Sequence, residues 1–114
     1  MIDTSKLIPL IDIALAEVDN FVAKSKYYQG GEEIIKNVKR ALYLLKEEVQ
    51  HHSANINERV LRAMHNLGMA SFKYFENAPL EKALNNVTGM LYDEIPYYKN
   101  LEPLGMDFGK GDPI

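Results

Sequence analysis

The sequence predicts an all-α protein: an antiparallel four-helix bundle with an irregular C-terminal tail packed on it. Four stretches have apolar residues spaced three and four apart, which places one apolar stripe along one side of a helix. Short polar or proline-containing breaks separate these stretches, as in bundles of antiparallel neighbours. The 114 residues are 46% hydrophobic and include no cysteine, so we expect one domain over residues 1–114 that buries its core without disulfides.

The first helix is predicted over residues 6–26. Pro9 lacks an amide hydrogen and restricts the residue before it, so regular helix is expected to begin within a residue or two of Pro9. Thr4 or Ser5 would cap any earlier turn. A glycine pair lies in the connection that follows the helix. A three-helix core with a loosely attached first helix is the alternative architecture.

The middle two helices are predicted over residues 32–52 and 56–76. Glu32 and Glu33 place negative charge at the positively polarised start of the first of them. Asn55-Ile56-Asn57-Glu58 resembles a capping box that starts the second, with asparagine in the capping position. The polar break between them lets the two helices fold back on each other. Their apolar stripes are expected to contain Ile34, Ile35, Val38, Ala41, Leu42, Leu45 and Val49, followed by Ile56, Val60, Leu61, Met64, Leu67, Phe72 and Phe75.

The fourth helix is predicted over residues 79–95, with Pro79 in its first turn and Pro96 at its end. Residues 96–114 form a tail in which proline and glycine forbid a regular element. Large apolar side chains nevertheless recur between Tyr97 and Phe108. Because a solvated tail would not need them, much of the tail is expected to lie against the bundle.

The net charge of −3 is unevenly placed along the chain. Residues 1–76 carry equal numbers of acidic and basic side chains, whereas residues 77–114 carry six carboxylates and three lysines. An acidic field argues against nucleic acid as a ligand and favours a basic partner. No apolar run approaches the length of a membrane span, and Asp12 interrupts the run that could serve as a secretion signal. We therefore expect a cytoplasmic protein without membrane contact.

The sequence offers little for catalysis. The absence of cysteine excludes thiol chemistry and zinc thiolate sites, and no serine lies in a nucleophile turn. Glu48-Val49-Gln50-His51 matches the Glu-x-x-His of di-iron bundles, but those sites need two such motifs and two further carboxylates. In the predicted hairpin, His52 and His65 differ in height by ~9 residues, or ~13 Å, which no shared ion can bridge. We therefore expect a protein that is not an enzyme and holds no cofactor or metal.

One group of residues in the last third of the chain suits protein binding. Tyrosine offers a large, rigid contact surface with a polar tip. Carboxylates beside it steer in a basic partner and pair with its lysines and arginines. The candidate contact residues are Tyr92, Asp93, Glu94, Tyr97, Tyr98, Glu102 and Asp107. The alternative is that the tyrosines cover the end of the bundle while the acidic residues keep it soluble.

The stretch Asp93-Glu94-Ile95-Pro96-Tyr97-Tyr98 resembles the recognition element of the small helical immunity proteins that neutralise colicin-type nucleases. That element reads Asp-x-x-Tyr-Tyr-Pro within an acidic four-helix bundle of similar size. Here the proline precedes the tyrosine pair, and the stretch lies late in the chain instead of after the second helix. The resemblance implies a bacterial, non-enzymatic toxin inhibitor that occludes a basic, nuclease-like domain.

Two further hypotheses come from other functional classes. The first is a helical structural or regulatory protein that self-associates through spare apolar surface at Tyr27, Tyr28, Tyr43 and Leu44. The second is a bundle enzyme that holds a metal. The sequence leaves open whether the protein is a monomer or a homodimer.

Overall fold

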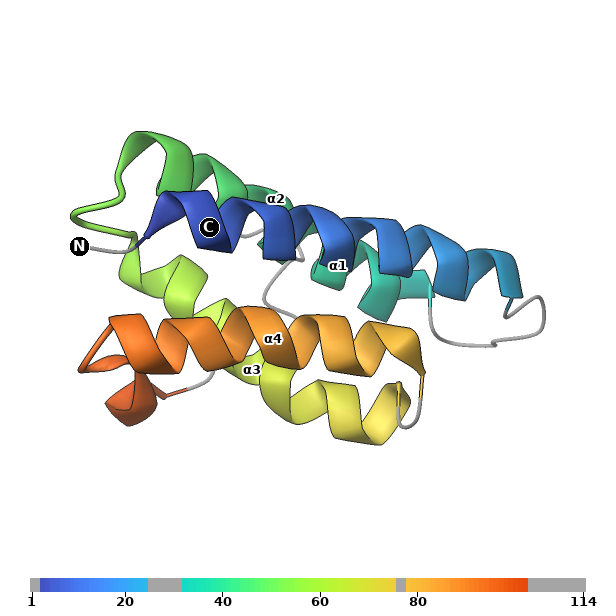
Figure 1. Cartoon of the computed structure of the whole chain (residues 1–114). Helices are drawn as coiled ribbons and strands as arrows, with labels where there is room; N and C mark the ends of the chain where they lie inside the picture. The colour runs from blue at the N-terminus through green and yellow to red at the C-terminus, as the bar shows by residue number, and fades with distance from the viewer. Residues whose placement is uncertain (1–2, 25–31, 76–77, 103–114) are drawn as a thin grey trace.

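The computed structural model describes residues 3–24, 32–75 and 78–102. These residues form four α-helices and one short 3₁₀ helix and contain no strand (Figure 1), which confirms the all-α prediction. Each α-helix begins and ends within two residues of its predicted bounds. In chain order the elements are α1 (Thr4–Lys24), α2 (Glu32–His51), α3 (Glu58–Tyr74), α4 (Pro79–Glu94) and η1 (Tyr98–Asn100).

α1 begins before Pro9, because Asp3 caps it. Asp3 Oδ1 accepts hydrogen bonds from the Ser5 amide at 3.1 Å and from the Ser5 hydroxyl at 2.6 Å. The Asp3 carbonyl also accepts hydrogen bonds from the amides three and four residues further on. The helix therefore starts ahead of Pro9, which lies inside it. The prediction that Thr4 or Ser5 caps this turn is wrong, since the preceding aspartate takes that role.

α3 is capped by Asn57 and not by Asn55. Asn57 Oδ1 accepts a hydrogen bond from the Arg59 amide at 2.9 Å, and the Asn57 carbonyl accepts from the amides three and four residues on. Glu48 of α2 completes the cap, because its Oε1 accepts a hydrogen bond from the Asn57 amide at 2.6 Å. In the predicted capping box, the Glu58 side chain would accept a hydrogen bond from the amide of the capping residue. In the structure Glu48 of the preceding helix accepts that hydrogen bond.

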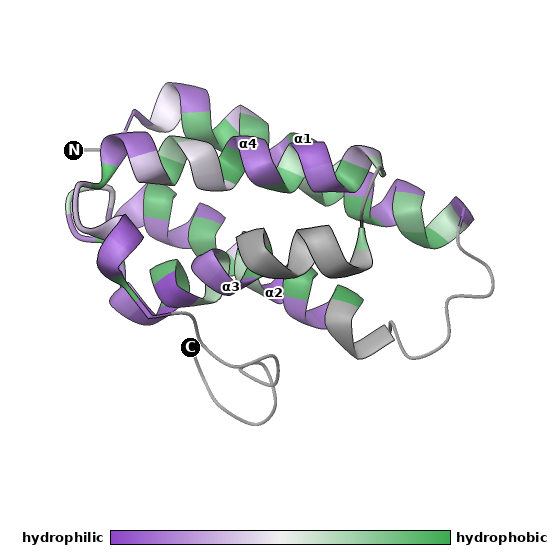
Figure 2. Cartoon of the chain, turned by 90° about the horizontal axis from the view of Figure 1, so that it is seen from below, coloured by the Kyte–Doolittle hydropathy of each residue, from purple (hydrophilic) through white to green (hydrophobic). Residues whose placement is uncertain are grey.

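The four helices pack around one hydrophobic core. α1 contacts α2 and α4, and α3 contacts the same two helices. Each helix therefore packs against the helix before it and the helix after it, and α1 also packs against α4. Where Figure 2 colours them, the helices have hydrophobic and hydrophilic residues on different sides. α1 contributes Leu7, Ile11, Ala14 and Val18, which are fully buried. The first helix is therefore part of the core, and the alternative of a loosely attached first helix is wrong.

Paired charges join α1 to α2 on the outside of the bundle. Lys39 Nζ lies 3.1 Å from Asp19 Oδ1, and Lys46 Nζ lies 2.7 Å from Asp12 Oδ1. Solvent-accessible pairs of this kind contribute roughly 0–1 kcal/mol each.

Among the described helices, none combines the length and the apolar character that crossing a membrane requires.

One end of the bundle gathers segments that are far apart in the sequence. Figure 1 shows the start of α1, the α2–α3 connection and η1 at this end. α4 ends at Glu94, because Pro96 cannot continue the helix. The chain then turns so that Tyr98 is buried and Leu101 packs partly buried against the core. The rest of the predicted tail, residues 103–114 with Asp107, lies outside the described residues.

Candidate functional site

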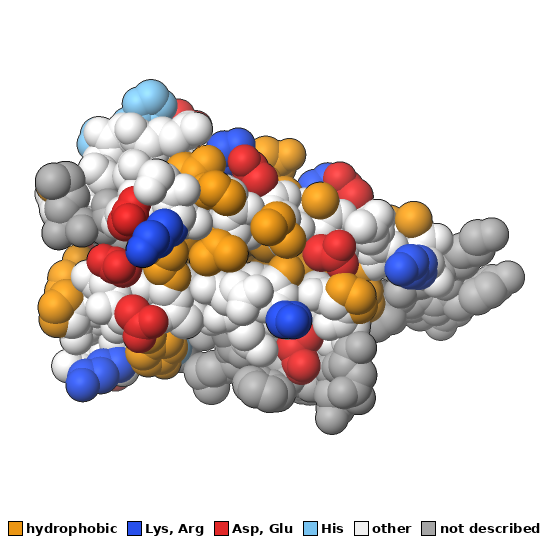
Figure 3. All heavy atoms as spheres, viewed as in Figure 1, with side chains coloured by type: hydrophobic (Ala, Val, Ile, Leu, Met, Phe, Trp, Pro, Cys, Tyr) orange, Lys and Arg blue, Asp and Glu red, His pale blue; other side chains and the backbone are white. Residues whose placement is uncertain are grey.

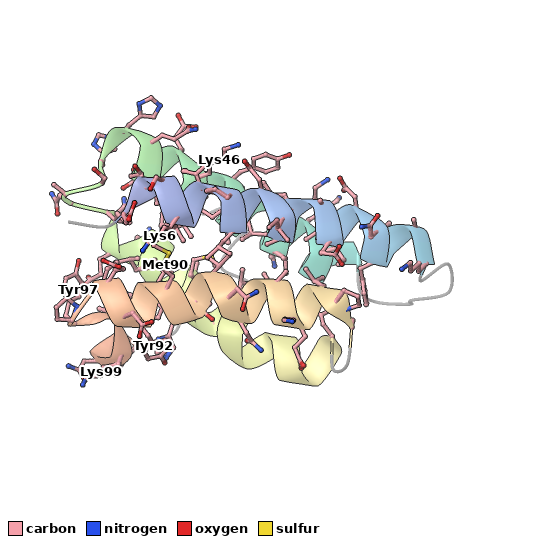
Figure 4. All side chains as sticks on the ribbon, in the orientation of Figure 1. Lys6, Lys46, Met90, Tyr92, Tyr97 and Lys99 are labelled. Carbon is pink, nitrogen blue, oxygen red and sulfur yellow. The ribbon has the colours of Figure 1, made fainter. Side chains whose placement is uncertain are left out.

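The structure distributes the tyrosine-containing stretch over two sides of the molecule. Successive helical residues point about 100° apart, so Tyr92, Asp93 and Glu94 project in different directions from α4. Figure 4 shows Tyr97 at the end of the bundle, whereas Tyr92 lies farther along α4. Asp93 and Glu94 are both exposed. The stretch therefore does not present its aromatic and acidic side chains on one continuous face.

Tyr98 lies inside the protein. Its exposed fraction is 0%, whereas Tyr92 and Tyr97 are 48% and 50% exposed. The prediction that Tyr98 contacts a partner directly is wrong, because the turn into η1 directs its ring into the core. Burial, and to a lesser extent the neighbouring Tyr92, raise the pKa of Tyr98 above its ordinary value of about 10, since a buried phenolate lacks solvation.

Tyr98 supports Tyr92 from within, as part of an aromatic cluster with His65 of α3. The rings of Tyr92 and Tyr98 meet edge to face with their centroids 4.9 Å apart. The His65 ring centroid lies 5.2 Å from that of Tyr98 and 5.8 Å from that of Tyr92. The Tyr98 hydroxyl and His65 Nδ1 are buried without a hydrogen-bond partner among the described residues. The cluster positions Tyr92 and joins η1 to α3 and α4.

Tyr97 borders an open hollow of about 610 Å³, which we name the end hollow. The α2–α3 connection and the adjoining helix ends form most of its wall. Its lining residues are Glu48, His52, Asn55, Ile56, Asn57, Glu58 and Tyr97. Tyr97 and Ile56 also line a smaller hollow of about 130 Å³, together with Glu94 and Pro96. Tyr97 is therefore the aromatic side chain around which this end of the molecule is hollowed.

Three carboxylates line the hollows that Tyr97 borders. Glu48 and Glu58 line the end hollow, and Glu94 lines the smaller hollow. Neither Glu58 nor Glu94 has a basic partner in the described part of the chain. Glu48 uses one oxygen to accept the Asn57 amide. Carboxylates without countercharges produce a negative potential, which is focused where they line a concave surface.

The acidic character is weaker around the other predicted contact residues. Arg62 Nε donates a hydrogen bond to the backbone carbonyl of Glu102 at 2.9 Å, which places a guanidinium next to this exposed residue. Lys99 is also exposed, and it follows Tyr98, which contacts Tyr92. Asp107 lies outside the described residues. Of the predicted contact tyrosines, Tyr97 is the one that lines these two hollows together with carboxylates.

Sequence reasoning missed Glu48, His52 and Glu58 as neighbours of Tyr97. A signal for them was nevertheless present. The predicted hairpin places residues 48 and 58 on either side of one turn, and an antiparallel arrangement would bring the end of the fourth helix to the same turn. The hollow is built from segments that no local motif connects.

The described residues contain no group of three His, Asp or Glu side chains placed to hold a metal ion. His51 and His52 are exposed near the end of α2, and His65 belongs to the aromatic cluster. The expectations that the protein lacks enzymatic activity and binds no cofactor remain predictions.

Comparison of the chain with protein-family models, with curated proteins and with solved structures finds no match.

Proposed function

We propose that this chain is a non-enzymatic binding protein of the bacterial cytoplasm that neutralises a basic, nuclease-like toxin domain by covering it. One observation carries the proposal: the half-exposed Tyr97 lines two hollows together with carboxylates, of which Glu58 and Glu94 have no basic partner in the described residues. Tyrosine is among the residues that most often anchor protein interfaces. Unpaired carboxylates beside such an anchor favour lysine and arginine on the partner.

Binding would begin with long-range attraction between the acidic end of the bundle and the basic domain, which raises the association rate. Contact at the end of the bundle would then bury Tyr97 and pair Glu94 with basic side chains. A partner that extends from this end along α4 would also cover the exposed part of Tyr92 and pair with Asp93. Tyr92 is already held by ring contacts with Tyr98 and His65, so its ordering on binding costs little entropy. The bound chain would obstruct the surface on which the toxin holds phosphate.

The proposed scaffold is an antiparallel bundle with the remaining tail packed on it. Its short connections support this arrangement. α3 has 17 residues and is ~25 Å long. The four residues that join it to α4, residues 75–78, span at most ~14 Å when fully extended. A chain that short cannot return to the start of α3, which favours opposite directions for these two helices.

Co-expression with a basic toxin domain encoded beside this chain tests the proposed function. The wild-type protein should protect the host cell and co-purify with the toxin domain. The double variant Tyr97→Ala with Asp93→Lys removes the anchor and reverses a charge. It should lose protection and bind about thirtyfold more weakly or worse, because truncation of an anchoring tyrosine costs about 2 kcal/mol or more.

Tyr43→Ala is the matched control. Tyr43 is 55% exposed, but it lies on α2 and lines neither hollow. This variant should protect and bind like the wild type. If the folded double variant does so too, the site assignment is wrong. If the wild type neither binds nor protects against such a domain, the proposed function itself is wrong.

Self-association is a second candidate function, and exposed apolar side chains favour it. Ile13 of α1 and Tyr43 of α2 are each more than half exposed. Figure 3 shows further hydrophobic side chains on the face that α1 crosses, between single acidic and basic side chains. Leu44 is half-buried, and Tyr27 and Tyr28 lie outside the described residues. Sedimentation of the wild type and of an Ile13→Glu, Tyr43→Ala variant decides: a dimer lost in the variant supports this function, and a monomeric wild type excludes it.

A further inference from the structure

We propose that the end hollow receives an arginine side chain of the basic partner, with its guanidinium stacked on Tyr97 and paired with Glu58. The inference rests on the proposed function and specifies the residue type that the partner inserts. It concerns the end of the bundle formed by the α2–α3 connection and Tyr97. This site is separate from the side of α4 where Tyr92 contacts Tyr98, so the two surfaces can be tested independently.

The end hollow has the size and lining that a long, partly apolar cation needs. Its volume of about 610 Å³ falls within the range of roughly 300–1,000 Å³ that is usual for ligand pockets. Ile56 lines it with the 6% of its surface that remains accessible, a small apolar contact for the methylene stem of arginine. Half of the Tyr97 side chain remains exposed, so its ring is available for stacking. The methylene stem of arginine can thus contact Ile56, its guanidinium plane can stack on Tyr97, and its charge can pair with Glu58.

The charges that line the hollow favour a cation and oppose an anion. Glu48 and Glu58 contribute two carboxylates, and Glu58 has no basic partner among the described residues. The residues that line the hollow in the described part of the chain include neither lysine nor arginine. Phosphate and acidic peptides would meet repulsion from both carboxylates. The occupant that charge complementarity selects is therefore a basic side chain of a protein.

Arginine matches the end hollow better than lysine does. A guanidinium is planar and weakly hydrated, so it stacks on an aromatic ring and still donates hydrogen bonds from its edge. That edge can pair with two carboxylate oxygens, as Glu58 offers, while an ammonium acts as a strongly hydrated point charge. An exposed tyrosine beside an unpaired carboxylate thus provides both of the contacts that distinguish the two cations.

Two blocked peptides of equal length and charge, oligo-arginine and oligo-lysine, provide the test with the full-length chain. Binding is followed by ¹H–¹⁵N NMR titration. We expect the arginine peptide to bind about two- to fivefold more tightly, which is the fold-change that one exposed cation–π contact produces. The largest chemical-shift changes should occur at the backbone amides of Asn55, Asn57, Glu58 and Tyr97.

Variants separate stacking from general attraction. Tyr97→Leu should abolish the preference for arginine, whereas Tyr97→Phe should keep it because the ring remains. Glu58→Gln should weaken the binding of both peptides. Glu47→Gln is the matched control, since Glu47 is exposed on α2 and lines neither hollow. This substitution changes the net charge by the same amount as Glu58→Gln. It should weaken binding less than Glu58→Gln does. Circular dichroism checks that each variant is folded.

Equal binding of the two peptides by the wild type overturns the inference, as does an arginine preference that survives in folded Tyr97→Leu. Chemical-shift changes confined to Tyr92 and Asp93 also overturn it, because the basic partner then binds beside α4 and the proposed function stands without the end hollow. Failure of the proposed function has a different signature. In that case the wild type gives no protection against a basic toxin domain, although the arginine preference at Tyr97 persists.

Discussion

Tyr98 lies in an environment that suits its ring and not its hydroxyl. The ring is fully buried and packs against Tyr92 and His65. The hydroxyl has no hydrogen-bond partner in the described part of the chain. A buried hydroxyl without a partner costs roughly 1–3 kcal/mol, because it has given up hydrogen bonds to water. One side chain thus combines a stabilising ring with a destabilising oxygen.

Replacing Tyr98 should separate these two contributions. Tyr98→Phe keeps the ring and should raise the free energy of unfolding by about 1 kcal/mol. Because the pKa of Tyr98 is raised in the folded protein, the unfolded chain loses this proton first. Wild-type stability should therefore be complete below about pH 10 and fall above it, by up to about 1.4 kcal/mol per pH unit. Tyr98→Phe should remove this part of the alkaline loss.

Urea denaturation at neutral pH and at several values above about pH 10 measures both effects. Tyr92→Phe serves as the control at neutral pH, since Tyr92 is half exposed and its hydroxyl is not among the buried atoms without a partner. That variant should change stability by less than about 0.5 kcal/mol. A loss of stability in Tyr98→Phe would show instead that the buried hydroxyl forms a hydrogen bond and stabilises the fold.

Tyr97 and Tyr98 are identical neighbours in the sequence with opposite environments. Both follow Pro96, and composition or charge does not distinguish them. The turn into η1 directs Tyr98 into the core and leaves Tyr97 half exposed at the end hollow. The interpretation of this stretch as a contact surface could not separate them, because irregular backbone lacks the periodicity that predicts burial in helices.

At the scale of single elements, the start of α3 depends on two helices. Asn57 caps α3 through its own side chain, and Glu48 of α2 accepts the Asn57 amide. Asn57→Ala should lower the free energy of unfolding by about 1 kcal/mol. Asn55→Ala should change it by less than about 0.5 kcal/mol, because no described hydrogen bond uses the Asn55 side chain and the residue is exposed. Thermal or urea unfolding of both variants measures the difference.

Equal effects of the two substitutions would mean that α3 does not start at Glu58 with Asn57 as its cap.

The sequence predicted the position of α3 well and its capping residue poorly. Apolar spacing is repeated along the whole helix, so several turns report the same face. The cap depends on one residue and on Glu48, whose approach to Asn57 requires that α2 and α3 already pack together.

At the scale of the whole molecule, α1 is expected to be essential to the core. Ile11 is fully buried, while Ile13 of the same helix is 54% exposed. Ile11→Ala should lower the free energy of unfolding by about 2–5 kcal/mol, because it removes buried methyl groups and leaves a cavity. Ile13→Ala should change it by less than about 0.5 kcal/mol. Equal, small effects of both substitutions in urea denaturation would contradict the placement of α1 in the core.

The end hollow is also a property of the whole molecule. Its walls come from the end of α2, the α2–α3 connection, the start of α3 and the corner after α4. The acidic excess of residues 77–114 predicted a negative surface, yet two of the three carboxylates that line the hollows at Tyr97 belong to the balanced part of the chain. The net charge of a segment therefore predicts that this surface is negative, but it does not predict which residues carry the charge.

The sequence by itself determined the four helices and their apolar faces, because helical periodicity is a local property that each stretch carries independently. It also identified Tyr92, Tyr97 and the neighbouring acidic residues as candidates for binding. Only the tertiary structure decided that Tyr98 is buried and that Glu48 and Glu58 line one hollow with Tyr97. Burial and electrostatic surroundings depend on contacts between distant parts of the chain, and these exist only once the helices have packed.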